Sequence, residues 1–318
     1  MSTAKTKNKI PVPPSFREVH TRIAGLRRVN LKTVEIDFLK SRLVLLLRGF
    51  MQVTPVLMVS QNLYRGVRWS EKPTSQSQLS YPPPDIITSY QRVNRPHQSM
   101  FYCSVAREAP FFELGLKPGD HVAMSRWRVN QKILVNNIGY SPSVLAGLGS
   151  KRQASTWGVP HPHLCSSRNT LIADFLASEF TRVVPPGNEH FYKFSIAIAE
   201  KLYIGPLHDE EFDRLGGILY PTIAMRANSD NLALIPEFVD RFLSLEAVEW
   251  IRVDSGGANL KLQVTKLDFA DSFGGTGQIE WKGRLPQWSV GSGRTVRVSV
   301  EDGKYVVRDE EGTIVEPT

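Results

Sequence analysis

The spacing of the apolar residues changes along the chain, and this change restricts the fold more than any single motif. Between Ser15 and Phe50 apolar residues recur every three or four positions, as they do on one face of a helix. After Trp250 apolar and polar residues alternate instead, in LKLQVTKLDF and TVRVSV, as they do along a strand with one buried face. The two patterns together predict an α+β protein.

Between these two regions, strand-like and helical segments are mixed. In chain order we expect a strand (57–69), a Pro-rich loop (81–85), a loop, strand and helix (91–115), two strands (121–129 and 132–140), a loop or insertion (141–170), two helices (173–184 and 190–205), and a strand, loop, strand and short helix (216–243). We therefore divide the chain into a basic tail with amphipathic helices (1–56), a central domain (57–250) and a small antiparallel β appendage (251–318). A hairpin at Asp302-Gly303 is expected in the appendage.

The positive charge of the chain is concentrated near its start. Of the 39 basic and 31 acidic residues, eleven and three lie in residues 1–50, which leaves 28 of each for the rest. The net charge of +8 therefore describes an arm attached to an electrically balanced body. The arm is interpreted either as helices that pack on the body or as a binding site for nucleic acid or another anionic surface. We favour packing, and do not expect nucleic acid as the main partner.

Several classes of protein are disfavoured by what the sequence lacks. Two cysteines, Cys103 and Cys165, are too few for a disulfide framework, so a cytoplasmic location is expected. The most apolar stretch, residues 43–59, contains Arg48 and Pro55 and is too interrupted for a membrane span, so no membrane partner is expected. The motifs GxGxxG, GxxxxGK[ST], HExxH and GxSxG are absent, so neither a Rossmann nor a P-loop nucleotide site is predicted.

Three short segments concentrate the residue types that carry chemistry, and their order and spacing resemble the RES domain family, named for an Arg, a Glu and a Ser. The family's Tyr-Arg at the end of a strand is matched by Tyr64-Arg65. Its second motif is Gly-Arg-x-Asn, an apolar strand ending in Tyr, and a Glu eleven residues on, which is matched by Gln91-Arg92-Val93-Asn94, Tyr102 and Glu113. Its third motif, Gly-Ile-x-Tyr-Pro-Ser followed by Asn-x-Ala-Leu, is matched by residues 217–222, with Thr222 in place of Ser, and by 231–234, beginning with Asn231.

The resemblance covers about residues 57–250 and implies an ADP-ribosyltransferase-like domain that cleaves NAD+ at the nicotinamide–ribose bond. ADP-ribose would pass to phosphate, water or a protein, with NAD+ as the substrate and without a metal. Small RES proteins are toxins of bacterial toxin–antitoxin pairs, which adds a helix-turn-helix antitoxin to the candidate partners.

The chemistry of NAD+ agrees with these residue types. An arginine side chain presents a planar fork of donors that matches phosphate oxygens. We therefore expect Arg65 and Arg92 to bind the pyrophosphate, with Tyr64 as a further NAD+-binding residue. A carboxylate beside the ribose stabilises the oxocarbenium-like state formed as nicotinamide leaves, and Glu113 is the candidate, with Glu108 as the runner-up. We predict Arg65, Glu113 and Thr222 as the catalytic set. Tyr102 would stack on a base, and Thr222 and Asn231 would bind ribose or amide groups through hydrogen bonds.

Each of these residues also has a plain structural interpretation as part of the core, a turn or the surface. Because Thr222 replaces Ser and Pro110 lies three residues before Glu113, a catalytically silent nucleotide-binding protein is the alternative function. A separate candidate is a zinc site at His161, His163 and Cys165, whose alternate positions share one side of an extended segment. A polar loop is the competing interpretation of that segment.

Overall fold

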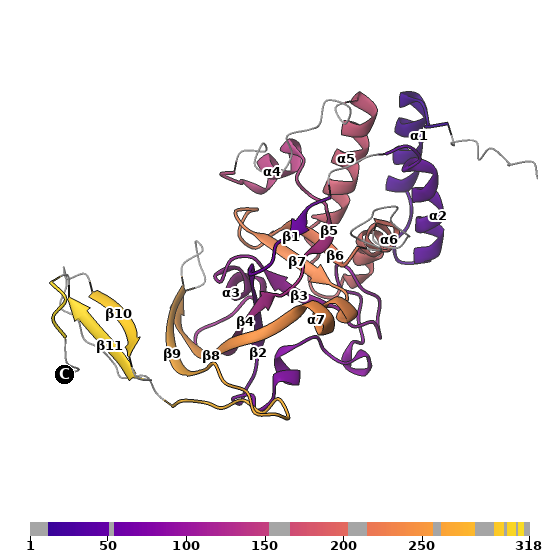
Figure 1. Ribbon diagram of the computed structural model, residues 1–318. Helices are drawn as coiled ribbons and strands as arrows, with labels where there is room; N and C mark the ends of the chain where they lie inside the picture. The colour runs from indigo at the N-terminus through magenta and orange to yellow at the C-terminus, as the bar shows by residue number, and fades with distance from the viewer. Residues whose placement is uncertain are drawn as a thin grey trace, which may run out of the picture.

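A mixed β-sheet forms the centre of the molecule (Figure 1). The structure is a computed structural model and describes residues 12–50, 54–152, 166–202, 215–256, 262–283, 296–301, 304–309 and 311–314. The strands of the main sheet in the described residues are β1 (Val56–Leu57), β2 (Asn62–Arg68), β3 (Phe101–Ser104), β4 (His121–Val129), β5 (Ile133–Asn137), β6 (Gly217–Pro221), β7 (Asp230–Leu234), β8 (Leu243–Gly256) and β9 (Leu262–Ala270).

The strands of this sheet follow the spatial order β1-β5-β6-β7-β3-β2-β4-β8-β9. Neighbouring strands are antiparallel except for β5 and β6, which run parallel. The helices are α1 (Phe16–Arg27), α2 (Ile36–Leu46), α3 (Ala109–Glu113), α4 (Pro142–Leu148), α5 (Ser167–Phe180), α6 (Tyr192–Leu202) and α7 (Pro236–Phe242), with short 3₁₀ turns η1 (Gln76–Leu79), η2 (Pro84–Ile86) and η5 (Glu189–Phe191). This mixture of helices with a mixed sheet confirms the α+β class.

The two N-terminal helices pack on the body of the molecule, as their periodicity predicts. Helix α1 begins at a capping box, in which the Ser15 side chain accepts from the backbone of Glu18 and the Glu18 side chain accepts from the backbone of Ser15. On α2, Leu39, Leu43 and Leu46 are fully buried. Burial of each such side chain contributes roughly 1.5–3 kcal/mol, so the apolar face of the arm is part of the core.

One face of the sheet is covered by helices, and the other holds a second apolar core. Helices α1, α2, α5 and α6 contribute most of the first core, which includes the sheet residues Ile218, Tyr220 and Ala233. The alternate residues of the same strands, such as Leu219 and Leu232, belong to the second core on the opposite face. The side-chain alternation of strands therefore separates the two cores.

A third, smaller cluster lies on the helix-covered face, further along the sheet. Side chains of α3, β4 and β8 form it, and Tyr64 of β2 packs against it. Tyr64 faces the same side of the sheet as Tyr220, because a chain of register partners links the two residues. The first core, beneath helices α1, α2, α5 and α6, and this third cluster, beneath α3, thus cover different parts of one face of the sheet.

Four charged side chains join the N-terminal helices to the body. Glu200 on α6 accepts from Lys40 of α2 at 2.7 Å and from Nε of Arg95 at 2.5 Å. Arg95 also pairs with Asp37 of α2 at 3.1 Å. Because Arg95 lies in the loop that carries Arg92, the arm is connected to a segment with predicted site residues.

Three expectations about elements need correction. The expected loop or insertion at 141–170 contains α4 and the first residues of α5. The expected strand at 57–69 is divided between β1 and β2. The alternating strand after residue 260 is not in an appendage, because β9 pairs with β8 along the edge of the main sheet. Within the described residues, β10 (Val296–Glu301) and β11 (Lys304–Asp309) form a sheet of their own, and their antiparallel pairing, with Glu301 opposite Lys304, confirms the hairpin.

Candidate functional site

A row of four paired residues crosses one face of the sheet and forms the floor of a cavity. Tyr220 of β6 is the register partner of Asn231 of β7, which pairs with Ser104 of β3, which pairs with Tyr64 of β2. All four side chains line a cavity of about 410 Å³. This volume lies in the usual range for small-molecule sites, roughly 300–1,000 Å³.

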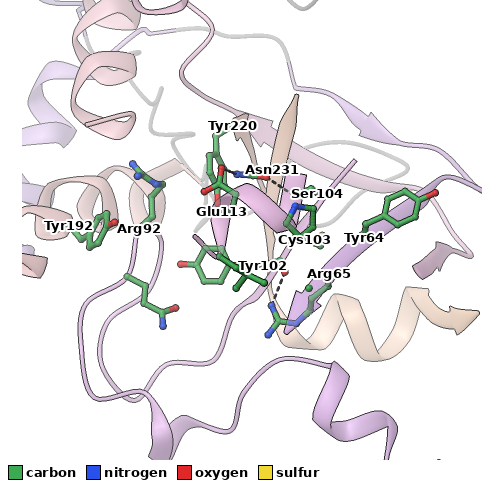
Figure 2. Close-up of a pocket in the computed structure, with 14 residues that line it drawn as sticks. Tyr64, Arg65, Arg92, Tyr102, Cys103, Ser104, Glu113, Tyr192, Tyr220 and Asn231 are labelled. Carbon is green, nitrogen blue, oxygen red and sulfur yellow. Dashed lines mark hydrogen bonds between the residues drawn. The ribbon is translucent and has the colours of Figure 1, made fainter. Parts of the chain in front are cut away.

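The walls of the cavity come from segments far apart in the sequence. Glu113 and Pro110 enter from α3, Tyr192 from α6 and Arg92 from the loop before β3. Figure 2 shows Tyr102 between Arg92 and Arg65, with Glu113 beside Asn231. The cavity therefore lies on this face of the sheet between the part packed against helix α6 and the part packed against helix α3.

Glu113 reaches the cavity because α3 packs very closely on β2. At Gly66 an added Cβ would lie 3.0 Å from Pro110 Cβ and 3.0 Å from Leu114 Cδ1, which is tighter than an ordinary contact. Pro110 occupies the first turn of α3, where proline is tolerated, so it does not disrupt the helix. The helix is short, and Glu113 is its last residue.

The carboxylate of Glu113 is held by a neutral donor at the wall of the cavity. Nδ2 of Asn231 donates to Oε1 of Glu113 at 2.7 Å. Burial raises the pKa of Glu113 above its ordinary value, while hydrogen bonds from Asn231 and the Ala224 backbone and the charge of Arg92 oppose the rise. Glu113 thus combines a raised pKa with a position in the cavity, a combination that marks candidate functional carboxylates.

Arg65 lines the cavity from a constrained position. Its Nε donates to the carbonyl oxygen of Ser80 at 3.1 Å and its Nη1 to that of Tyr102 at 2.7 Å, and its guanidinium lies 5.3 Å from the Phe101 ring centroid. Burial lowers the pKa of Arg65 to about 10. No carboxylate forms a salt bridge with Arg65 within the parts of the chain that the structure describes. A half-buried guanidinium without a carboxylate partner is suited to an anionic ligand.

Arg92 and Tyr102 are also fixed by hydrogen bonds. Arg92 donates to the carbonyl oxygens of Phe180 and Arg182 at the end of α5, and its guanidinium lies 5.3 Å from the Tyr192 ring centroid. The hydroxyl of Tyr102 donates to Oδ1 of Asn94 at 2.7 Å and accepts from the backbone of Val93. The predicted Tyr64, Arg65, Arg92, Tyr102, Glu113 and Asn231 all line the same cavity.

Thr222 is the exception among the predicted residues, and the catalytic role predicted for it does not fit its position. It is fully buried and is not among the residues that line the cavity. Its hydroxyl donates to the carbonyl oxygen of Ser229 at 3.2 Å and accepts from the backbone of Ser229 at 3.3 Å. The turn between β6 and β7 uses both capacities of the hydroxyl, so the structural interpretation is the better one.

Several lining residues had no predicted role, among them Ser104, Tyr192 and Tyr220. Ser104 and Tyr220 come into the site through strand register, and Tyr192 comes from the first turn of α6. Cys103 also lines the cavity, but burial raises the pKa of its thiol, so it is not an activated nucleophile. The signals for them in the sequence were that Tyr220 is the tyrosine of the 217–222 motif and that Ser104 lies two residues after Tyr102, on the same face of the strand.

The remaining predictions concern metals and membranes. His161, His163 and Cys165 lie outside the described residues. Within the described residues no group of three or more His, Cys, Asp or Glu side chains is arranged to hold a metal ion. In the same part of the chain, no helix combines the length and the apolar character needed to cross a bilayer.

Comparison with known proteins adds no family to this description. No protein-family model matches the sequence, and no curated protein shows significant similarity to it. The site must therefore be interpreted from its own chemistry.

Proposed function

We propose that this protein cleaves NAD+ at the nicotinamide–ribose bond and transfers ADP-ribose to phosphate, water or a protein, as an enzyme of the RES type with an ADP-ribosyltransferase-like fold. One observation supports this proposal above the others. The carboxylate of Glu113, held by Asn231, shares a cavity with two arginines, Arg65 and Arg92, that form no salt bridge in the described parts of the chain. A dinucleotide with an anionic pyrophosphate and a ribose that becomes cationic needs both kinds of charge.

The positive charges would hold the substrate. The pyrophosphate carries two negative charges, and Arg65 and Arg92 both border the cavity. Because existing hydrogen bonds fix both guanidinium groups, they would lose little side-chain entropy when a phosphate binds. The ring of Tyr102, fixed through its hydroxyl, offers a surface on which a base can stack.

The negative charge would act on the bond that breaks. The electron pair of the ribose–nitrogen bond leaves with nicotinamide, which becomes neutral, and the ribose becomes an oxocarbenium-like cation. An ionised Glu113 stabilises that cation more than it stabilises the ground state, which is what lowers the barrier. The acceptor oxygen then bonds to the anomeric carbon, and a proton is lost from water if water is the acceptor.

Nicotinamide release from NAD+, measured with and without phosphate, tests the proposal. Wild-type protein should turn over NAD+, and Glu113→Gln should reduce the rate by about 10²–10³-fold while retaining NAD+ affinity. Glu108→Gln is the matched control, because Glu108 is exposed immediately before α3 and does not line the cavity. Folded wild-type protein that releases no nicotinamide under either condition would contradict the proposal.

The position of Thr222 favours a second candidate, a nucleotide-binding protein without turnover. The hydroxyl that the RES motif would supply is committed to the β6–β7 turn in this chain. Calorimetry distinguishes the candidates, since this one predicts NAD+ affinity that depends on Arg65 without any nicotinamide release.

A further inference from the structure

Ser104 is the start of a chain of hydrogen bonds that ends at Glu113. It lies directly opposite Asn231 in the β3–β7 register, and its Oγ donates to Oδ1 of Asn231 at 2.6 Å. Nδ2 of the same amide donates to Oε1 of Glu113 at 2.7 Å. Ser104 and Asn231 are 3% and 4% exposed, so water has little access to replace either contact.

The direction of these bonds is set by what each group is able to do. An ionised carboxylate only accepts hydrogen bonds, so Asn231 has to present its NH₂ group to Glu113. The amide oxygen then faces Ser104, whose hydroxyl can donate to it. Without this hydroxyl the buried amide oxygen would have no donor on that side, and the amide would lose the contact that distinguishes its two orientations.

We infer that Ser104 is a positioning residue, which orients the amide of Asn231 so that it donates to Glu113 and thereby holds this carboxylate in the cavity. As a statement about catalysis the inference rests on the proposed NAD+ cleavage. As a statement about the carboxylate it does not, because the hydrogen bonds exist in the protein without ligand.

A double-mutant cycle tests whether Ser104 acts through Asn231. Ser104→Ala should reduce kcat/KM for nicotinamide release roughly 5- to 30-fold, the effect of one buried hydrogen bond. In an Asn231→Ala background the same substitution should change kcat/KM by less than about twofold, because the intermediate group is gone. Ser104→Thr keeps the hydroxyl on a residue suited to a strand and should restore most of the activity. Equal losses in both backgrounds would overturn the inference.

A second measurement does not depend on turnover. The pKa of the Glu113 carboxyl can be followed in the free protein by NMR with ¹³C-labelled glutamate, and Glu113→Gln identifies its signal. Ser104→Ala should raise this pKa, because a less constrained Asn231 stabilises the ionised carboxylate less well. Ser104→Thr should leave it near the wild-type value. Ser104→Cys, which keeps the size but donates weakly, provides the same comparison if the alanine variant does not fold.

The two measurements separate the possible failures. If wild-type protein releases no nicotinamide but Ser104→Ala raises the Glu113 pKa, the proposed function is wrong and the positioning role stands. If turnover is present but the pKa is unchanged and the cycle is additive, the positioning role is wrong and the proposed function stands.

Discussion

Asn231 on β7 donates to Glu113 at the end of α3 over 2.7 Å, although the two residues are 118 positions apart in the sequence. The contact places an amide donor beside a carboxylate that burial alone would keep protonated to a higher pH. It links the floor of the cavity to its α3 wall.

The raised pKa of Glu113 predicts a pH-dependent effect on stability. In the folded state the carboxyl binds its proton more tightly than in the unfolded chain, so the wild type loses stability as pH rises from the ordinary value of 4.5 through the raised one. Glu113→Gln carries no charge at any pH. The variant should therefore gain stability relative to wild type above this range.

Urea denaturation at pH 4 and pH 8 measures this difference. The free energy of unfolding of Glu113→Gln, relative to wild type, should be larger at pH 8 than at pH 4. Glu108→Gln, which removes a carboxylate that does not line the cavity, is the control. A Gln variant whose relative stability is the same at both pH values would argue against a raised pKa.

Arg65→Lys should weaken NAD+ binding while keeping the positive charge. An ammonium group has no planar fork, so it cannot reproduce the pair of bonds to the carbonyl oxygens of Ser80 and Tyr102 and still face the cavity. We expect Kd to rise roughly tenfold by calorimetry, which corresponds to about 1.4 kcal/mol. Arg128→Lys is the control, because Arg128 is an exposed residue of β4 paired with Glu246. Equal affinities for wild type and Arg65→Lys would show that Arg65 does not hold the ligand.

Glu200→Gln should loosen the N-terminal helices from the body. Burial alone would raise the pKa of Glu200, but hydrogen bonds and charges from Arg95 and Lys40 outweigh it and lower the pKa. The ion pairs therefore stabilise the fold above the unfolded pKa of Glu200, and this contribution is lost as pH falls through the lower folded value. Because Arg95 and Lys40 are partly exposed, we expect a loss of about 1–3 kcal/mol at pH 7.

Asp37→Asn is the matched control for this network. The Asp37 side chain is 71% exposed, so its removal should cost less than about 1 kcal/mol at pH 7. Thermal unfolding at pH 7 and pH 3 measures both variants. The model of the network is wrong if Asp37→Asn is as destabilising as Glu200→Gln, or if the effect of Glu200→Gln persists unchanged at pH 3.

Gly66→Ala tests the close contact that positions Glu113. The new methyl group would push on Pro110 and Leu114 and move α3 away from β2. If Glu113 acts as proposed, we expect nicotinamide release to fall at least tenfold, because a small displacement of the carboxylate from the ribose is costly, while the fold loses about 1–3 kcal/mol. Gly25→Ala in α1 has no neighbour within 4 Å of the new carbon and should gain up to about 1 kcal/mol. Full activity in Gly66→Ala would show that the close packing of α3 on β2 is not needed to position Glu113.

The sequence was sufficient wherever a structure depends on neighbours along the chain. Helices α1 and α2 follow from apolar residues every three or four positions, and β6, β7 and α7 follow from the 216–243 pattern. The residue types of the site were also visible, since six of the seven predicted side chains line one cavity. The positions of the charged residues along the sequence were already enough to show that the charge of the arm is separate from the balanced body.

Only the tertiary structure decided how these pieces meet. Strand register paired Ser104 with Asn231, although 127 positions separate them. The turn between β6 and β7 binds the Thr222 hydroxyl through hydrogen bonds to Ser229, so this hydroxyl does not face a ligand. Pairing with β8 made β9 an edge strand of the main sheet rather than part of an appendage. Local periodicity reports which face of an element is buried, but not what it is buried against. That choice depends on pairing and packing energies summed over distant segments, which is why the members of the site could be predicted and their hydrogen bonds could not.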